Sequence, residues 1–324
     1  MLRALGLGDF LAGVPALRAL RRAVPAAELV LAAPAGLAPL VDLAGVADRV
    51  LDTAGPVTPP WRGERPDLAV DLHGRGPRSH RALLALEPAR LLAFDCPEAG
   101  HHGPLWVADE HERDRWCRLV AEGLGVTADP DDVLLRSPER PSPAPDAVVL
   151  HPGAGARARR WPVERFAAVA RHLRDEGHRV VVTGSADERA TACDVARLAG
   201  LGADAVLAGR TDLGQLAALV SGARLVVCGD TGTAHLASAY AVPSVVLFGP
   251  VPPSEWGPPT TGPHTVLWSG LRRGDPHGDS LDPGLEAISV DEVLAAVRAR
   301  LAPVAEVPEV RPGRTTSSPL ATPG

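Results

Sequence analysis

Residues 226–250, VVCGDTGTAHLASAYAVPSVVLFGP, place a run of small and polar residues between two apolar runs. The apolar runs predict buried strands over residues 225–228 and over SVVLFGP. The polar run predicts a tight turn followed by a short helix over about residues 233–240. This order is typical of parallel sheets, in which ligands bind beyond the carboxyl ends of the strands. The turn is therefore the first candidate site.

The same alternation of strands and helices extends along the whole chain. In the second half, predicted strands lie in AVVLHPG, RVVVTG, AVL and LVVCGD, and predicted helices lie in PVERFAAVARHLRDEG, DERATACDVARLAG, DLGQLAALVSGA and residues 290–301. In the first half, strands are predicted in MLRALGLG, AELVLAAP, LAVDLHG and ARLLAF, with helices over about 10–22, 37–43, 78–86 and 110–124. This pattern predicts the α/β class, with two Rossmann-like doubly wound parallel-sheet domains facing a cleft.

A chain of 324 residues exceeds the size at which one hydrophobic core stops growing. The segment LRSPERPSPAPDA, residues 135–147, is polar and rich in proline, as linkers are. We expect a first domain over residues 1–136, a linker over 137–147 and a second domain over 148–302. The tail, 303–324, is expected to be disordered.

Composition excludes several classes of protein. The apolar share of 45% is ordinary for a globular protein, and a net charge of −6 without a basic face argues against a nucleic-acid partner. The four cysteines have no paired spacing, so we expect neither a metal site nor disulfides, and a cytoplasmic location. Because Arg3 and Asp9 interrupt the apolar N-terminal stretch, we expect no signal peptide or membrane span.

The turn after residues 225–228 has the chemistry of an anion site. The predicted helix begins there, near Gly232, and the first turn of a helix has unpaired N–H groups and a partial positive charge. Thr231 and Thr233 add hydroxyl donors, and His235 faces the same end. We interpret the turn as a diphosphate cradle. The alternative is that Asp230 or Thr231 only caps the helix.

A second loop, HPGAGARARRW, opens the second half at the end of another predicted strand. Arg157, Arg159 and Arg160 follow its small residues, and guanidinium groups bind phosphate oxygens in pairs of hydrogen bonds. A basic loop of this kind is also typical of a solvated surface. The residues alone leave both interpretations open.

The first loop of the chain, LGLGDF, carries Asp9. Gly6, Gly8 and Gly13 do not match the dinucleotide fingerprint G-x-G-x-x-G, because the third glycine is displaced, so we expect no NAD cofactor. Asp9 is interpreted either as a helix N-cap or as a carboxylate at the rim of the cleft that acts as a general base.

Together the three loops resemble glycosyltransferase family 9, the ADP-heptose:lipopolysaccharide heptosyltransferase family, which has a GT-B fold. The resemblance is carried by LGLGDFLAGVPALRAL, HPGAGARARRWPVERFAAVARHL and VVCGDTGTAHLASAYAVPSVVLFGP, and it runs from about residue 2 to residue 301. It implies an inverting, metal-independent enzyme without a cofactor. The enzyme would move heptose or a related sugar from a nucleotide diphosphate donor, expected to be ADP-linked, to a hydroxyl of a glycan or lipid-linked acceptor. A lipid-linked acceptor would imply peripheral contact with the inner face of the cell membrane.

The resemblance also implies roles for single residues. Asp9 matches the general base of the family, and Arg159 stands where the family has a lysine that binds the donor diphosphate. Glu188 matches a glutamate near the nucleoside. The donor-binding motif is matched by Asp230, Thr231, Gly232 and His235, beside the hydroxyl of Thr233.

Two other functions stay open on the sequence alone: a nucleotide-sugar epimerase or hydrolase of GT-B type, and a nucleotide-sugar-binding module without turnover. For an acceptor, the segment DLHGRGPRSHR follows a predicted strand and is expected to overlook the cleft. Its residues His73, Arg75 and Arg78 are the candidate acceptor contacts.

Two polar regions receive no role from the sequence. The loop over residues 266–289, which contains His277 and Asp279, is interpreted as solvated. His101, His102 and His111 are interpreted as surface histidines, because their spacing does not suit a metal site.

Overall fold

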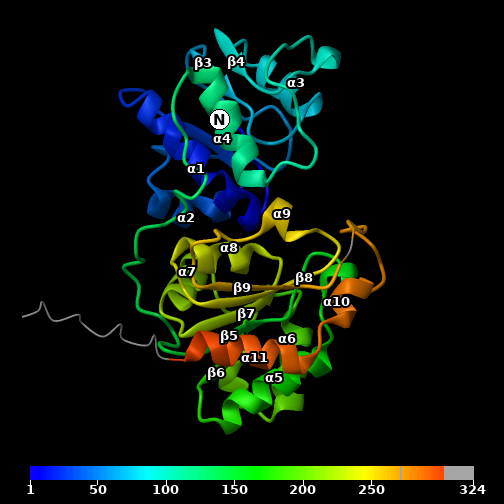
Figure 1. The fold of residues 1–324 in the computed structure, drawn as a ribbon. Coiled ribbons are helices and arrows are strands. Elements are labelled where there is room, and N and C mark those ends of the chain that lie inside the picture. The colour runs from blue at the N-terminus through cyan, green and yellow to red at the C-terminus, as the bar shows by residue number, and fades with distance from the viewer. Residues whose placement is uncertain (271, 303–324) are drawn as a thin grey trace, which may run out of the picture.

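The protein consists of two α/β halves stacked one on the other, as Figure 1 shows, with the first half in blue to cyan and the second in green to red. The structure is a computed structural model, and it describes residues 1–270 and 272–302. The predicted disordered tail, 303–324, lies outside the described residues.

Two short pairs of parallel strands organise the first half. The strands are β1 (Val30–Ala33), β2 (Arg49–Asp52), β3 (Leu68–Val70) and β4 (Arg90–Leu92). β1 pairs with β2 and β3 pairs with β4, and Leu2 bridges the two pairs through Ala32 and Asp71. The strand predicted for MLRALGLG is therefore much shorter than expected. Residues from Leu7 onward belong to a helix instead, which buries their apolar side chains.

The second half contains a five-stranded parallel sheet in the order β6-β5-β7-β8-β9. Its strands are β5 (Val148–His151), β6 (Val180–Val182), β7 (Leu225–Gly229), β8 (Ser244–Phe248) and β9 (His264–Trp268). The strand predicted for AVL is reduced to a single bridge, from Val206 to Val182 at the end of β6. Strand order reverses between β5 and β7, where doubly wound sheets bind their ligands.

Helices cover these sheets close to the predicted positions. They are α1 (Leu7–Ala23), α2 (Ala38–Ala44), α3 (Arg78–Leu84), α4 (Glu112–Leu124), α5 (Val163–Asp175), α6 (Arg189–Ala199), α7 (Leu213–Ser221), α8 (Gly232–Ala239), α9 (Pro253–Trp256), α10 (Pro283–Ala287) and α11 (Val290–Leu301). α9 and α10 are single turns that the sequence analysis missed. Of the helices in the described residues, none has both the length and the apolar composition that crossing a membrane demands.

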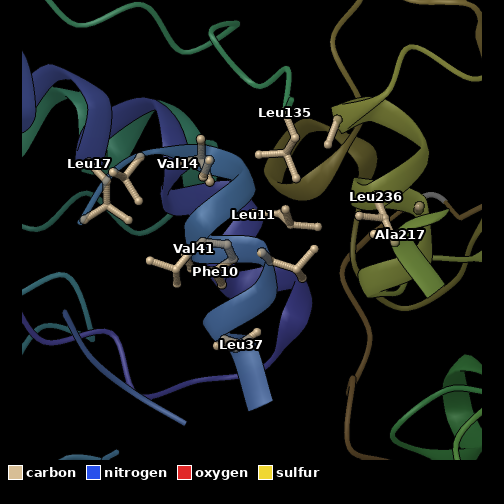
Figure 2. Close-up of a cluster of buried hydrophobic side chains, with 14 of the residues drawn as sticks. Phe10, Leu11, Val14, Leu17, Leu37, Val41, Leu135, Ala217 and Leu236 are labelled. Carbon is tan, nitrogen blue, oxygen red and sulfur yellow. The ribbon is translucent and has the colours of Figure 1, made fainter. Parts of the chain in front are cut away.

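Helix pairs that join the two halves include α1 with α8, α2 with α7, and α4 with α9. Figure 2 shows side chains from both halves in one buried cluster, including Phe10 and Leu11 of α1 and Leu236 of α8. Leu135, which precedes the predicted linker, packs in the same cluster. The predicted domain boundaries stay a prediction, because apolar packing continues across the interface.

A polar contact also joins α4 to α9. His111 is the N-cap of α4, where its Nδ1 accepts a hydrogen bond from the Arg113 N–H. The other ring nitrogen, Nε2, lies 3.1 Å from the carbonyl oxygen of Gly257, to which it donates in this tautomer. The interpretation of His111 as a surface histidine is therefore wrong.

Candidate functional site

A cavity of about 970 Å³ lies between the two halves. From the first half it is lined by Gly6, Leu7, Gly8, Asp9 and Gly36. From the second half it is lined by His151, Ala154, Gly155, Arg159, Thr183, Gly184, Ser185, Ala186, Glu188, Thr211, Asp212, Leu213, Leu216, Asp230, Thr231, Gly232, Thr233, His235, Val251, Trp256, Arg273, Pro276 and His277. The structure thus brings Asp9 and all the predicted donor-binding residues to one space.

Asp9 lies in the first turn of α1, at the edge of the cavity. The N-cap of this helix is Gly6, so Asp9 is not the capping residue that one interpretation made it. Burial raises the pKa of the Asp9 carboxyl above its ordinary value, against the opposing effect of Arg3. A carboxylate with a raised pKa beside a cavity is suited to accept a proton.

The helix α8 begins at Gly232, directly after β7 and its turn. Thr231 is the N-cap, but its side chain makes no capping hydrogen bond. Its Oγ1 is buried and finds no partner among the residues that the structure describes. Since the first N–H groups of a helix lack intrahelical acceptors, this end of α8 offers donors to an anion. The capping interpretation of Thr231 is not supported by this geometry.

Asp230 and Arg159 form an ion pair at the cavity wall. Arg159 Nη2 lies 3.0 Å from Asp230 Oδ2 and also donates to the Asp230 carbonyl oxygen. Burial raises the pKa of the Asp230 carboxyl, while Arg159 lowers it. The Nε of Arg159 is buried and has no partner within the described part of the chain. Asp230 therefore holds the guanidinium in place, and of the three loop arginines only Arg159 lines the cavity.

Glu188 stands at the entrance to α6, next to the loop after β5. Its Oε2 accepts a hydrogen bond of 2.7 Å from the Ser185 N–H. A Cβ on Gly153 would lie only 2.2 Å from the Glu188 carboxyl carbon, so the loop approaches this side chain as closely as a glycine allows. The carboxylate is thereby fixed toward the cavity, where it can accept hydrogen bonds from hydroxyl groups.

His235 lies one turn into α8, with its ring edge-on to Trp256 at a centroid distance of 5.8 Å. Burial, together with the charge of Arg113 and other cations, lowers the pKa of His235 to about 3. His235 is therefore neutral near pH 7. It can donate or accept one hydrogen bond at this end of the cavity, but it adds no positive charge there.

Sequence reasoning missed several cavity residues. His151 ends β5, and its Nδ1 is buried without a partner among residues 1–270 and 272–302. Trp256 comes from the unpredicted α9. Arg273 and His277 come from the loop that was interpreted as solvated, and they line the cavity rim. A hydrogen bond of 3.1 Å from the Ala158 N–H to the Gly278 carbonyl oxygen ties that loop to the arginine loop.

The predicted acceptor residues do not line the cavity. Arg75 and Arg78 are exposed, near the start of α3. His73 is half-buried, and its backbone N–H donates a hydrogen bond of 2.9 Å to Asp71 Oδ1. Contact between these three residues and an acceptor stays a prediction.

Comparison with solved structures supports the two-domain architecture. The Escherichia coli ADP-heptose lipopolysaccharide heptosyltransferase II superposes with a TM-score of 0.73 at 22% identity, covering 93% of this chain and 97% of that one. An E. coli heptosyltransferase solved with ADP superposes with a TM-score of 0.69 at 19% identity, covering 92% of this chain and 98% of that one. This likeness confirms the predicted GT-B fold.

Similarity in sequence is confined to part of the chain. Lipopolysaccharide heptosyltransferase 2 of E. coli K12 is 34% identical over 128 residues, which is 36% of either chain. Lipopolysaccharide heptosyltransferase 1 of Pseudomonas aeruginosa is 40% identical over 115 residues, which is 35% of this chain and 31% of that one. The matched segments thus span about a third of these relatives. The model of glycosyltransferase family 9 (heptosyltransferase) matches residues 107–276, more than half of the sequence. Asp9 from the first half and the predicted donor-binding residues from the second half also line one cavity. On the family match, the chain belongs to glycosyltransferase family 9.

Proposed function

We propose that the protein is an inverting glycosyltransferase. It moves heptose or a related sugar from a nucleoside diphosphate donor, with ADP as the expected nucleotide, to a hydroxyl of a glycan or lipid-linked acceptor. The observation that carries the proposal is the placement of Asp9 and the α8 N-terminus on one cavity, from opposite halves of the molecule. Contact with a membrane surface would follow from a lipid-linked acceptor and stays a prediction.

The second half supplies the groups that stabilise the leaving diphosphate. Negative charge builds on that group as its bond to the sugar breaks, and fixed donors aimed at such charge are usually the largest catalytic contribution. The N–H groups at the start of α8, the Thr231 hydroxyl and the Arg159 guanidinium are donors of this kind. With one fixed cation and a helix end at the diphosphate, the proposed reaction uses no metal ion.

The first half supplies the base. Asp9 takes the proton of the acceptor hydroxyl while its oxygen forms a bond to the anomeric carbon, and the bond to the diphosphate breaks with its electron pair. A single displacement of this kind inverts the configuration at the anomeric carbon. Family membership and the names of the relatives, which are lipopolysaccharide heptosyltransferases, support heptose as the sugar.

The proposal is tested by a donor screen followed by product analysis. A ligand at about 100 times its dissociation constant stabilises a protein by about 2.7 kcal/mol, so ADP-, GDP-, UDP- and dTDP-sugars can be ranked by thermal shift. We expect ADP-heptose to give the largest shift. Labelled ADP-heptose and a heptose-free lipopolysaccharide core should then give an inverted product, at the same rate with a chelator present. Free sugar released equally fast with and without acceptor would instead identify a hydrolase.

Replacing Gly153 by Ala is expected to weaken ADP binding about tenfold, because the new Cβ displaces the Glu188 carboxylate and one charge-assisted hydrogen bond is lost. Calorimetric titration of ADP into the variant measures this loss. Glu188→Gln should weaken binding similarly, and the double variant should be no weaker than either single one. Additive losses would show that Gly153 acts by another route.

A further inference from the structure

Arg3 is completely buried beneath the first turn of α1, and nothing in the reaction above uses it. Its Nε donates a hydrogen bond of 2.5 Å to the carbonyl oxygen of Asp9. Its Nη1 donates to the carbonyl oxygen of Leu72, just beyond β3, and its Nη2 lies 3.5 Å from Glu112 Oε1. One guanidinium thus connects the Asp9 backbone, the end of a central strand and the first turn of α4.

The surroundings of Arg3 are shaped for a guanidinium. A Cβ on Gly13 would lie 2.6 Å from Arg3 Nε, so only glycine leaves room at this position of α1. Glycine inside a helix costs about 1 kcal/mol relative to alanine, and the close approach of Arg3 explains its presence here. The Trp116 ring covers the guanidinium, with Arg3 Cζ 4.9 Å from the ring centroid.

Glu112 is the counter-charge of this network. It is buried on α4, where its Oε1 accepts a hydrogen bond of 2.7 Å from Trp116 Nε1. Its Oε2 accepts from Arg115 Nη1, so two guanidinium groups share one carboxylate. A buried ion is stable only when it is paired and hydrogen-bonded, and both Arg3 and Glu112 meet that condition.

The two charges act on Asp9 in opposite directions. Burial raises the pKa of Asp9, Arg3 lowers it, and Glu112 raises it further. Charged and titratable groups of other elements also surround this carboxyl. His73 after β3 and Asp230 after β7 both interact electrostatically with Asp9, and His235 of α8 lies against Gly8, the residue before Asp9.

We propose that Arg3 and Glu112 are a buried pair of positioning residues, which fix the first turn of α1 and oppose each other in tuning Asp9 as a base. The proposal rests on the proposed role of Asp9 in transfer. Arg3 holds the backbone of the turn and favours the ionised carboxylate. Glu112 holds Arg3 and limits that effect.

The test titrates the Asp9 carboxyl directly, in the full chain. Protein labelled with ¹³C at the aspartate carboxyls is followed by NMR against pH, and the Asp9 signal is assigned by its absence in Asp9→Asn. We expect the midpoint to rise in Arg3→Gln and to fall in Glu112→Gln. Arg22→Gln, which removes an exposed arginine at the other end of α1, is the matched control and should leave the midpoint in place.

A purely structural role would not move the midpoint in opposite directions. Unchanged midpoints, or shifts of the same sign, overturn the proposal. If Arg3→Gln does not fold, Glu112→Gln still decides, since it retains the shape of the side chain. Arg3→Lys keeps the charge but not the two backbone hydrogen bonds. It is expected to lower kcat by about 10²-fold, the cost of a small misplacement, with the dissociation constant for ADP unchanged.

The titration separates this proposal from the proposed function. If Asp9→Asn retains full turnover, Asp9 is not the base, yet the opposite shifts can still be observed. If Asp9→Asn loses turnover but neither midpoint moves, Asp9 keeps its role and the pair of Arg3 and Glu112 does not tune it.

Discussion

Asp9→Asn is expected to lower the rate of sugar transfer by about 10²–10⁴-fold, the usual contribution of a positioned general base. The amide has nearly the shape of the carboxyl but cannot take the proton of the acceptor hydroxyl. Single-turnover rates with ADP-heptose measure the loss. The dissociation constant for ADP should be unchanged, because the proposed diphosphate donors, Arg159 and Thr231, come from the other half of the molecule and Asp9 is proposed to act on the acceptor.

The stability of the same variant provides an internal check. The pKa of Asp9 is raised in the folded protein, mainly by burial. A carboxyl of this kind contributes stability at a pH below its unfolded pKa, and the contribution is lost as the pH rises through the folded pKa. At pH 7 the charged form is therefore unfavourable, and Asp9→Asn should melt at the same temperature or higher. A large fall in the melting temperature would identify Asp9 as a structural residue.

Arg159→Ala is expected to lower kcat by about 10²–10³-fold, the loss measured when one fixed donor to developing charge is removed. It should also weaken ADP binding, since the cavity loses a cation that is hydrogen-bonded to Asp230, just before the start of α8. Arg159→Lys restores a cation at this position, and it should recover most of the activity. Initial rates and calorimetric titration of ADP measure both effects.

The structure supplies a matched control for Arg159. Arg157 lies two residues earlier in the same loop, is exposed and does not line the cavity, so Arg157→Ala should behave as the wild type does. Removal of Arg159 also leaves the buried Asp230 carboxylate without its partner, which destabilises the protein. Arg159→Ala with Asp230→Asn removes both charges. If this double variant is stable and active while Arg159→Ala alone is neither, the role of Arg159 is to neutralise Asp230 and not to bind the diphosphate.

Local signals allowed much of the site to be predicted. A turn of small residues between a buried strand and a helix is typical of ligand-binding loops, and Thr231 and Gly232 lie in such a turn, on the wall of the cavity. The succession of most strands and helices along the chain also followed from the apolar runs. The strands β2 and β9 escaped prediction because they are only partly buried, so their apolar runs are short and mixed with polar residues.

The rest of the site depends on partners that are remote in sequence. Arg3 meets Leu72 and Glu112 across 69 and 109 positions, and no pattern around Arg3 indicates either contact. His277 reaches the cavity because its loop is hydrogen-bonded to Ala158, far earlier in the chain. Asp230, in contrast, was assigned to the donor from its motif. Its carboxylate is also paired with Arg159, a contact that the sequence could not show, and its role at the donor stays a prediction.

The apolar interface between α1 and α8 makes the two halves depend on each other for stability. Phe10 and Leu11 belong to the same buried cluster as Ala217 and Leu236, so the interiors of the two halves are continuous. A fragment that ends or begins at residues 137–147 would expose the apolar residues of this interface to water, and such an exposed patch is prone to aggregation. The intact chain should therefore unfold in one cooperative step, and neither half is expected to survive as an independent recombinant fragment.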